Sequence, residues 1–143
     1  MQPHQYIIIV GCGRLGSMLA NQLSSLGSSV IVIDREETAF DKLSTEFSGF
    51  LVTGNAAELD VLRRARIDKA DCLLATTQHD NVNLMVAQVA QKIFQVPKVI
   101  ARVSNPSRER VYDQFGIETI CPTTLSAEAF LKALGNQPEA QPS

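Results

Sequence analysis

Residues 11–16 read Gly-Cys-Gly-Arg-Leu-Gly and directly follow the run Tyr-Ile-Ile-Ile-Val at 6–10. A Gly-x-Gly-x-x-Gly string alone is a weak signal, because glycine is common at turns. Here the run at 6–10 predicts a strand buried on both faces, and apolar residues at helical spacing follow the glycines. A second buried strand is predicted at 29–33 and ends on an acid, Asp34. Strand, turn, helix and acid together predict a turn that binds nucleotide phosphates.

Each glycine of this turn has its own expected task. Gly11 allows a tight turn, Gly13 lets the backbone approach a pyrophosphate, and Gly16 lets the helix pack closely on the strand. The helix N-terminus directs amide groups at phosphate oxygens. We therefore expect the whole turn to contact the ligand, namely Gly11, Cys12, Gly13, Arg14, Leu15 and Gly16. For Arg14 two interpretations stay open, a guanidinium paired with a phosphate or a solvent-facing helix residue.

Asp34 lies about twenty residues after the glycines, where an acid accepts hydrogen bonds from the hydroxyls of an adenosine ribose. The alternative is an acid at a strand end that only meets solvent. A carboxylate here repels a 2′-phosphate, so NAD(H) or an adenosine nucleotide is favoured over NADP. Arg35 beside it weakens that exclusion.

The rest of the chain alternates between predicted strands and helices. Further strands are predicted at 50–53, 72–75, 98–103 and 117–121. Helices are predicted at 15–26, 36–47, 58–65, 79–95, 106–115 and 125–134. This alternation favours an α/β fold, a Rossmann-type doubly wound parallel sheet of six strands in the order 3-2-1-4-5-6. Gly54-Asn55-Ala56 and Thr76-Thr77 then fall at the edge of the sheet where ligands bind.

Composition is that of an ordinary globular domain and excludes several classes of protein. The 143 residues are 45% hydrophobic and 20% charged, which predicts one compact core. A net charge of −2 without a long basic run argues against a nucleic-acid partner. The apolar run at 6–10 is too short for a signal core or a membrane span, so we expect a cytoplasmic protein.

Residues with catalytic or redox chemistry are sparse. The cysteines are scattered and lack CxxC spacing, which favours reduced thiols that serve as small apolar side chains. A redox role stays open for Cys12, because a helix N-terminus lowers the pKa of a thiol. The sequence lacks a Ser-His-Asp order, a Tyr-x-x-x-Lys pair and a metal cluster, and His79 is interpreted as a capping or exposed residue. We expect no enzyme, and a small NAD-dependent oxidoreductase is the alternative.

Short motifs recur along residues 5–134. They are Ile-Val-Gly-Cys-Gly-Arg-Leu-Gly at 9–16, Val-Ile-Asp-Arg at 32–35, Gly-Asn-Ala at 54–56, Ala-Asp-Cys-Leu-Leu-Ala-Thr-Thr at 70–77, Asn-Val-Asn-Leu at 81–84, Val-Ile-Ala-Arg-Val at 99–103 and Phe-Gly-Ile at 115–117. This series resembles the RCK (regulator of potassium conductance) N-terminal domain family, also called TrkA-N. Many members read Gly-Asp-Ala where this chain has Gly-Asn-Ala, so one negative charge near the nucleotide is absent.

The resemblance implies a regulator of potassium channels or transporters rather than a catalyst, with NAD(H), ATP, ADP or AMP in the crevice of the sheet. It places Gly11, Gly13, Arg14 and Gly16 at the phosphates and Asp34 at the ribose. It also implies that Asn55 and Ala56 lie on the adenine side, Thr76 and Thr77 on the far side of the nucleotide, and Arg102 near the ligand or the dimer seam.

The resemblance also implies partners. It implies a homodimer, a possible ring, and a membrane potassium channel or transporter subunit that holds this protein at the inner membrane. The last helix, 125–134, resembles the crossover element with which such domains embrace a partner. A sensor module of another membrane transporter is a second alternative. We expect a nucleotide-binding domain at 1–135 and a disordered tail at 136–143, without the companion C-terminal lobe usual in the family.

Overall fold

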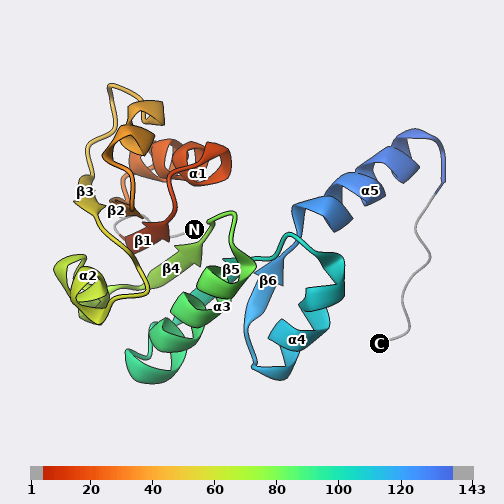
Figure 1. The fold of residues 1–143 in the computed structure, drawn as a ribbon. Helices are drawn as coiled ribbons and strands as arrows, with labels where there is room; N and C mark the ends of the chain where they lie inside the picture. The colour runs from red at the N-terminus through yellow and green to blue at the C-terminus, as the bar shows by residue number, and fades with distance from the viewer. Residues whose placement is uncertain (1–4, 137–143) are drawn as a thin grey trace.

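A computed structural model describes residues 5–136, which contain one six-stranded parallel sheet in the order β3-β2-β1-β4-β5-β6 (Figure 1). The strands are β1 (Tyr6–Val10), β2 (Ser29–Asp34), β3 (Phe50–Thr53), β4 (Cys72–Ala75), β5 (Lys98–Arg102) and β6 (Glu118–Ile120). The order reverses direction at β1, so the crevice between β1 and β4 opens at the carboxyl ends of the strands. The expected fold class and strand order are confirmed.

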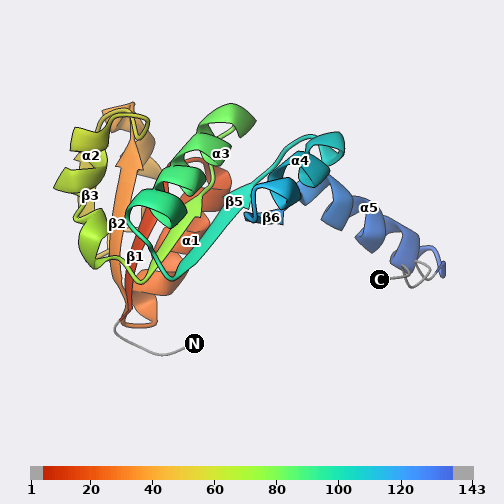
Figure 2. The ribbon, with the colours of Figure 1, turned by 90° about the horizontal axis from the view of Figure 1, so that it is seen from below.

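The two faces of the sheet are covered by α1 (Arg14–Ser25), α2 (Leu59–Arg64), α3 (Asp80–Gln88) and α4 (Glu109–Gln114). The last helix, α5 (Pro122–Ala133), does not cover the sheet. Ile8 and Val10 of β1 face the core shared with α2 and α3, whereas Ile7 and Ile9 face the core shared with α1. Figures 1 and 2 show α1 on one side of the sheet and α2 and α3 on the other. Because β1 is buried on both faces, its sequence is continuously apolar rather than alternating.

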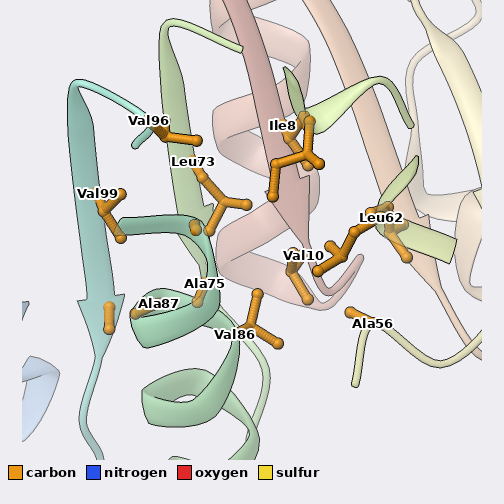
Figure 3. Packing of buried hydrophobic residues seen from close by; sticks show 14 of the residues in the cluster. Ile8, Val10, Ala56, Leu62, Leu73, Ala75, Val86, Ala87, Val96 and Val99 are labelled. Carbon is orange, nitrogen blue, oxygen red and sulfur yellow. The ribbon is translucent and has the colours of Figure 1, made fainter. Parts of the chain in front are cut away.

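The larger core determines how closely α3 lies on the sheet. Ala75 of β4 and Ala87 of α3 are fully buried and lie beside each other (Figure 3). Two side chains this small let the helix lie close to the strand. Val10 and Leu62 fill the space between β1 and α2 in the same core (Figure 3). The position of α3 matters for the site, because the loop that precedes it borders the crevice.

The prediction of a helix over the whole of 36–47 is wrong. The structure contains only a 3₁₀ helix, η1 (Glu37–Lys42). Leu43 then has an extended backbone with ψ 144°, and the Ser44 amide donates to a side-chain oxygen of α1 at 2.9 Å. This bond helps turn the chain away from the helical path, while Phe40 stays buried against the α1 face. The apolar spacing therefore predicted burial correctly and the helix incorrectly.

Other boundaries differ by a few residues. The helix predicted at 79–95 is α3 followed by a π-helical turn, η3 (Val89–Ile93). The helix predicted at 106–115 begins as a 3₁₀ turn, η4 (Pro106–Arg108), before α4. The last helix begins at proline, three residues before the predicted start at 125, because proline is well suited to the first helical turn.

The C-terminal helix α5 extends away from the sheet (Figures 1 and 2). None of its residues is buried, Phe130 is 73% exposed, and Leu134, directly after the helix, is 75% exposed. In residues 5–136 no helix combines the length and the apolar character needed to cross a membrane. Apart from Asn136, the tail expected at 136–143 lies outside the described residues.

Candidate functional site

The turn between β1 and α1 is tightly packed at both ends. Gly11 has φ +101°, and a Cβ there would lie 3.0 Å from the Thr77 amide nitrogen. A Cβ on Gly16 would lie 1.9 Å from the Gly11 carbonyl oxygen and 2.8 Å from Thr76 Oγ1. Alanine fits neither position unless the backbone moves, so these two glycines set the shape of the turn. Their packing tasks match those expected from the sequence.

Gly13 has a different environment. Its backbone is extended, with φ −86° and ψ −159°, and a Cβ there would have no atom within 4 Å. The fold itself therefore does not require glycine at this position. Gly13 is the residue before the first turn of α1, whose amide groups lack acceptors within the helix. Open space beside such amides suits the close approach of a phosphate.

Arg14 and Leu15 lie at the outer rim of the turn. Both are exposed, and the structure, as far as it describes the chain, shows no ion pair of the Arg14 guanidinium. The side chain is therefore not used to hold the fold. Both interpretations made from the sequence, phosphate partner and solvent-facing residue, stay open at this point.

Asp34 joins the end of β2 to the glycine turn. One carboxylate oxygen accepts the Cys12 amide at 2.8 Å, and the other accepts the Glu36 amide at 2.9 Å. Each carboxylate oxygen can accept a further hydrogen bond, so the bonds already made leave capacity for a ligand hydroxyl. Arg35 is exposed beside it.

The loop after β3 forms the wall next to Asp34. Asn55 Oδ1 accepts the Ala57 amide at 2.9 Å, and the Asn55 carbonyl accepts the Glu58 amide at the same distance. The asparagine side chain thus shapes a local turn before α2. Ala56 is 5% exposed and packs into the larger core, which anchors the loop from below.

The two threonines after β4 direct their hydroxyls inward. Thr76 is 8% exposed, and its hydroxyl donates to the carbonyls of Val10 and Gly11 at 3.0 and 3.1 Å. The amide and hydroxyl of Thr77 both donate to Asn83 Oδ1, at 3.0 and 2.7 Å. The hydroxyl of Thr76 therefore secures the glycine turn, and the expected place of both threonines on the far side of the nucleotide stays a prediction.

Together these loops enclose a cleft of about 710 Å³ at the carboxyl ends of the central strands, within the usual size of a small-molecule site. Among the predicted site residues, it is lined by Gly11, Cys12, Gly13, Asp34, Arg35, Asn55, Ala56, Thr76 and Thr77. The remaining four, Arg14, Leu15, Gly16 and Arg102, do not line it.

Several lining residues were missed by the sequence analysis. Glu36, Thr38, Ala39 and Lys42 come from η1 or its start, Gln78 and His79 come from the β4–α3 connection, and Val82 comes from the first turn of α3. Lys42 brings a cation to the wall that Asp34 and Glu36 make acidic. Spacing alone could not have identified Thr38 and Lys42, because this segment is a 3₁₀ helix in which residues four apart do not share one face.

The redox role left open for Cys12 is contradicted by its surroundings. The side chain is 1% exposed, and burial together with the nearby Asp34 carboxylate raises the pKa of the thiol. The helix N-terminus does not overcome these two effects. Cys12 is therefore a neutral buried thiol at physiological pH, and its backbone amide donates to Asp34.

Arg102 acts behind the cleft wall rather than in it. Its guanidinium donates to the Thr77 carbonyl at 2.9 Å. Asn83, which is fully buried, donates to the same carbonyl and to the carbonyl of Arg102, both at 2.9 Å. The sequence analysis gave Asn83 no role, although an asparagine within an apolar helix is a polar residue that needs buried partners.

Comparisons with known proteins agree with this architecture. The family model described as the TrkA-N domain matches residues 7–122. The Trk system potassium uptake protein TrkA of Streptomyces coelicolor is 41% identical over 129 residues, and a TrkA homolog of Methanothermobacter thermautotrophicus is 34% identical over 134 residues. These matches cover 90% and 94% of this chain but 58% and 62% of the relatives, so the chain spans about three fifths of their length.

Solved structures share the fold at lower sequence identity. The TrkA-N domain of the inner membrane protein ybaL from Escherichia coli superposes with a TM-score of 0.81 at 23% identity, covering 94% of this chain and 99% of that one. The AMP-bound Kef CTD of Shewanella denitrificans gives 0.76 at 24% identity, covering 92% and 83%. The GsuK channel bound to NAD gives 0.71 at 23% identity, covering 91% and 23%. With the sequence match over residues 7–122, the conclusion is that this chain belongs to the TrkA-N domain family.

Proposed function

We propose that this chain is the nucleotide-sensing domain of a cytoplasmic regulator of potassium uptake, and that NAD(H) or ATP, ADP or AMP binds in the cleft. The observation that carries the proposal is Gly13, a glycine that the fold does not need, placed beside free helix amides and the Asp34 carboxylate. The relatives named as potassium uptake proteins support the partner, a membrane potassium channel or transporter subunit. Neighbours bound to NAD and AMP support the ligand class.

The cleft suggests how such a ligand would lie. The phosphates would approach Gly13 and the first turn of α1, the ribose hydroxyls would donate to Asp34, and the adenine would lie toward Asn55 and Ala56. A carboxylate at the ribose disfavours NADP. Arg14 stands at the rim, where a longer phosphate chain would reach its guanidinium, so it would discriminate ATP from AMP.

A regulatory role fits the polar groups of the cleft better than catalysis does. His79 is the imidazole on its wall, and within residues 5–136 no ion pair or hydrogen bond orients that ring. A general acid or base is normally held by such a partner. A small NAD-dependent oxidoreductase remains the alternative function. Steady hydride transfer to a carbonyl substrate would support that alternative.

The exposed α5 supports a homodimer. Exposed apolar residues lie on this helix and directly after it, with 44% to 75% of each residue exposed: Leu125, Phe130, Leu131 and, after the helix, Leu134. Apolar groups gathered on a projecting helix mark an interface more often than a solvent face. Nucleotides that prefer different angles between paired domains would then shift the gate of the membrane partner, and a ring of dimers would sum the effect.

Isothermal titration calorimetry with NAD, NADH, ATP, ADP and AMP tests the proposal. We expect binding with affinities that differ among the five ligands, because only differential affinity can drive a switch. Arg14→Ala should weaken the binding of ATP by about tenfold and the binding of AMP by much less. Arg110→Ala removes another exposed guanidinium, from α4 and outside the cleft lining, and should change neither affinity. Absence of binding by all five nucleotides would contradict the proposal.

A further inference from the structure

The direction of α5 depends on a small set of bonds at its first turn. No residue of the helix is buried, so packing does not hold it against the sheet. The hydroxyl of Thr123 donates to the Ser104 carbonyl at 3.3 Å, and the hydroxyl of Thr124 donates to Glu109 Oε1 at 3.0 Å. Anything that moves Ser104 therefore shifts one of the points on which α5 rests.

Ser104 is itself held by a carboxylate from the other side of the cleft wall. Its amide donates to Asp80 Oδ1 at 2.8 Å, and the amide of Asn105 lies 3.4 Å from Asp80 Oδ2. Hydrogen bonds to an ionised carboxylate are stronger than those between neutral groups. The Tyr112 hydroxyl from α4 also donates to the Asp80 carbonyl. Asp80 thus joins α3, α4 and the segment after β5 at one point.

Asp80 directly follows the loop that borders the cleft. Thr77 and His79 line the cleft, and Asp80 is the first residue of α3. The loop cannot move independently of this helix, because Asn83 accepts both the amide and the hydroxyl of Thr77. A ligand that displaces the loop would therefore displace the start of α3 and the Asp80 carboxylate with it.

We propose that Asp80 is a positioning residue that couples the occupancy of the cleft to the direction of α5, through Ser104 and Thr123. The inference rests on the proposed function and adds to it the route by which a bound nucleotide reaches the exposed helix. Within the protomer α5 has hydrogen bonds at its base and no buried residue, so its direction relative to the sheet depends on those bonds. Asp80 and Thr123 do not line the cleft, so the route can be cut without removing a ligand contact.

A second connection between the two regions competes with this route. β6 pairs with β5, Arg102 opposite Ile120, directly before the start of α5. The Val103 amide also donates to the Ile120 carbonyl at 3.0 Å. A backbone ladder of this kind is insensitive to side-chain substitution at Asp80 or Thr123. The two routes therefore predict different results for the same variants.

Hydrogen exchange measured by mass spectrometry, with and without a saturating nucleotide, tests the route in the full chain. We use whichever of NAD, NADH, ATP, ADP and AMP binds the unmodified protein most tightly. Exchange in α5 is expected to change by about fivefold or more on binding, the lower range of allosteric coupling. Thr123→Val preserves the branched shape and removes the hydroxyl, and should abolish this change while the nucleotide binds within about twofold of its normal affinity.

Two further variants keep the result interpretable. Asp80→Asn should also abolish the α5 response, because it removes the charge and one of the two acceptor oxygens. Thr124→Val makes the same chemical change one residue along, at a hydroxyl bonded to Glu109 instead of Ser104, and should keep the response. Loss of the response in Thr124→Val, or its survival in Thr123→Val, would overturn the route. Failure of every nucleotide to bind would instead refute the proposed function.

Discussion

The cleft and α5 are held in opposite ways. Around the cleft, Gly16 leaves no room for a methyl group, Asp34 accepts two backbone amides, and Thr76 and Asn83 bond the loops from behind. α5 has no buried residue and rests on two threonine hydroxyls. A recognition site gains affinity from groups that are already in place, whereas an output element needs freedom to move. The difference assigns recognition to the cleft and response to α5.

Gly16→Ala tests the tight packing around the cleft and should have the largest effect on stability. The added Cβ would lie 1.9 Å from the Gly11 carbonyl oxygen, so the helix or the turn must shift. We expect the free energy of unfolding to fall by about 3 kcal/mol, the upper range for overpacking. Urea denaturation measures the loss. An unfolding free energy within about 0.5 kcal/mol of the original would show that the turn is more adaptable than described.

Asp34→Ala tests whether the acid serves the ligand as well as the turn. It removes two acceptors of ribose hydroxyls, and the affinity for NADH or AMP should fall by about 10- to 100-fold. Asp34→Asn is the matched control, because it keeps the shape and one acceptor and removes the charge. In calorimetry this second variant should bind NADP better relative to NAD. An unchanged NADP to NAD preference would contradict the assignment of Asp34 to the ribose.

Gly13→Ala separates binding from folding within the same turn as Gly16. Its Cβ meets no protein atom within 4 Å and its φ is −86°, so the fold should tolerate alanine. Stability should be unchanged or rise by about 0.5 kcal/mol, because alanine reduces the entropy of the unfolded chain. Nucleotide affinity should fall by about tenfold, since the methyl group occupies the approach of the phosphate. Calorimetry and urea denaturation together check both halves of this expectation.

Phe130→Glu tests the exposed helix α5 and should have the smallest effect on the folded protomer. Phe130 is 73% exposed, so the unfolding free energy of the protomer should change by no more than about 0.5 kcal/mol. The proposed dimer should weaken by at least about tenfold in analytical ultracentrifugation. Lys132→Glu changes the charge of the same helix without removing an apolar anchor. If both variants left association unchanged, α5 would not be the interface.

The sequence predicted the elements that depend on local chemistry. The run at 6–10, the glycine turn and Asp34 determine a buried strand, a helix N-terminus and a charged strand end, and all three are present in the structure. The order of the parallel strands was predictable because short crossover connections allow few sheet topologies. Gly11 and Gly16 were predictable for the same reason, since a φ of +101° strains any other residue and a Cβ at Gly16 would lie 1.9 Å from a backbone oxygen.

The parts that were missed depend on contacts between distant segments. The expected helix at 36–47 is short because the Ser44 amide bonds to α1, a partner about twenty residues away that spacing does not reveal. Thr76 lines the cleft, but its hydroxyl donates to the carbonyls of Val10 and Gly11. These contacts depend on the pairing of two strands that lie far apart in the sequence. Lys42 and Asn83 were missed because a cation in a turn and an amide in a helix are ordinary until their neighbours are known.

The central claim, that the cleft between the glycine turn and Asp34 is the nucleotide site, is tested most directly by NMR titration. A uniformly ¹⁵N-labelled sample is titrated with NADH, and each assigned amide is followed. The account predicts that the largest shifts occur at Cys12, Gly13, Asn55 and Thr77, with smaller shifts at Ser104 and the first turn of α5. Shifts confined to other surfaces, or no shift at any of these amides at saturation, would contradict it.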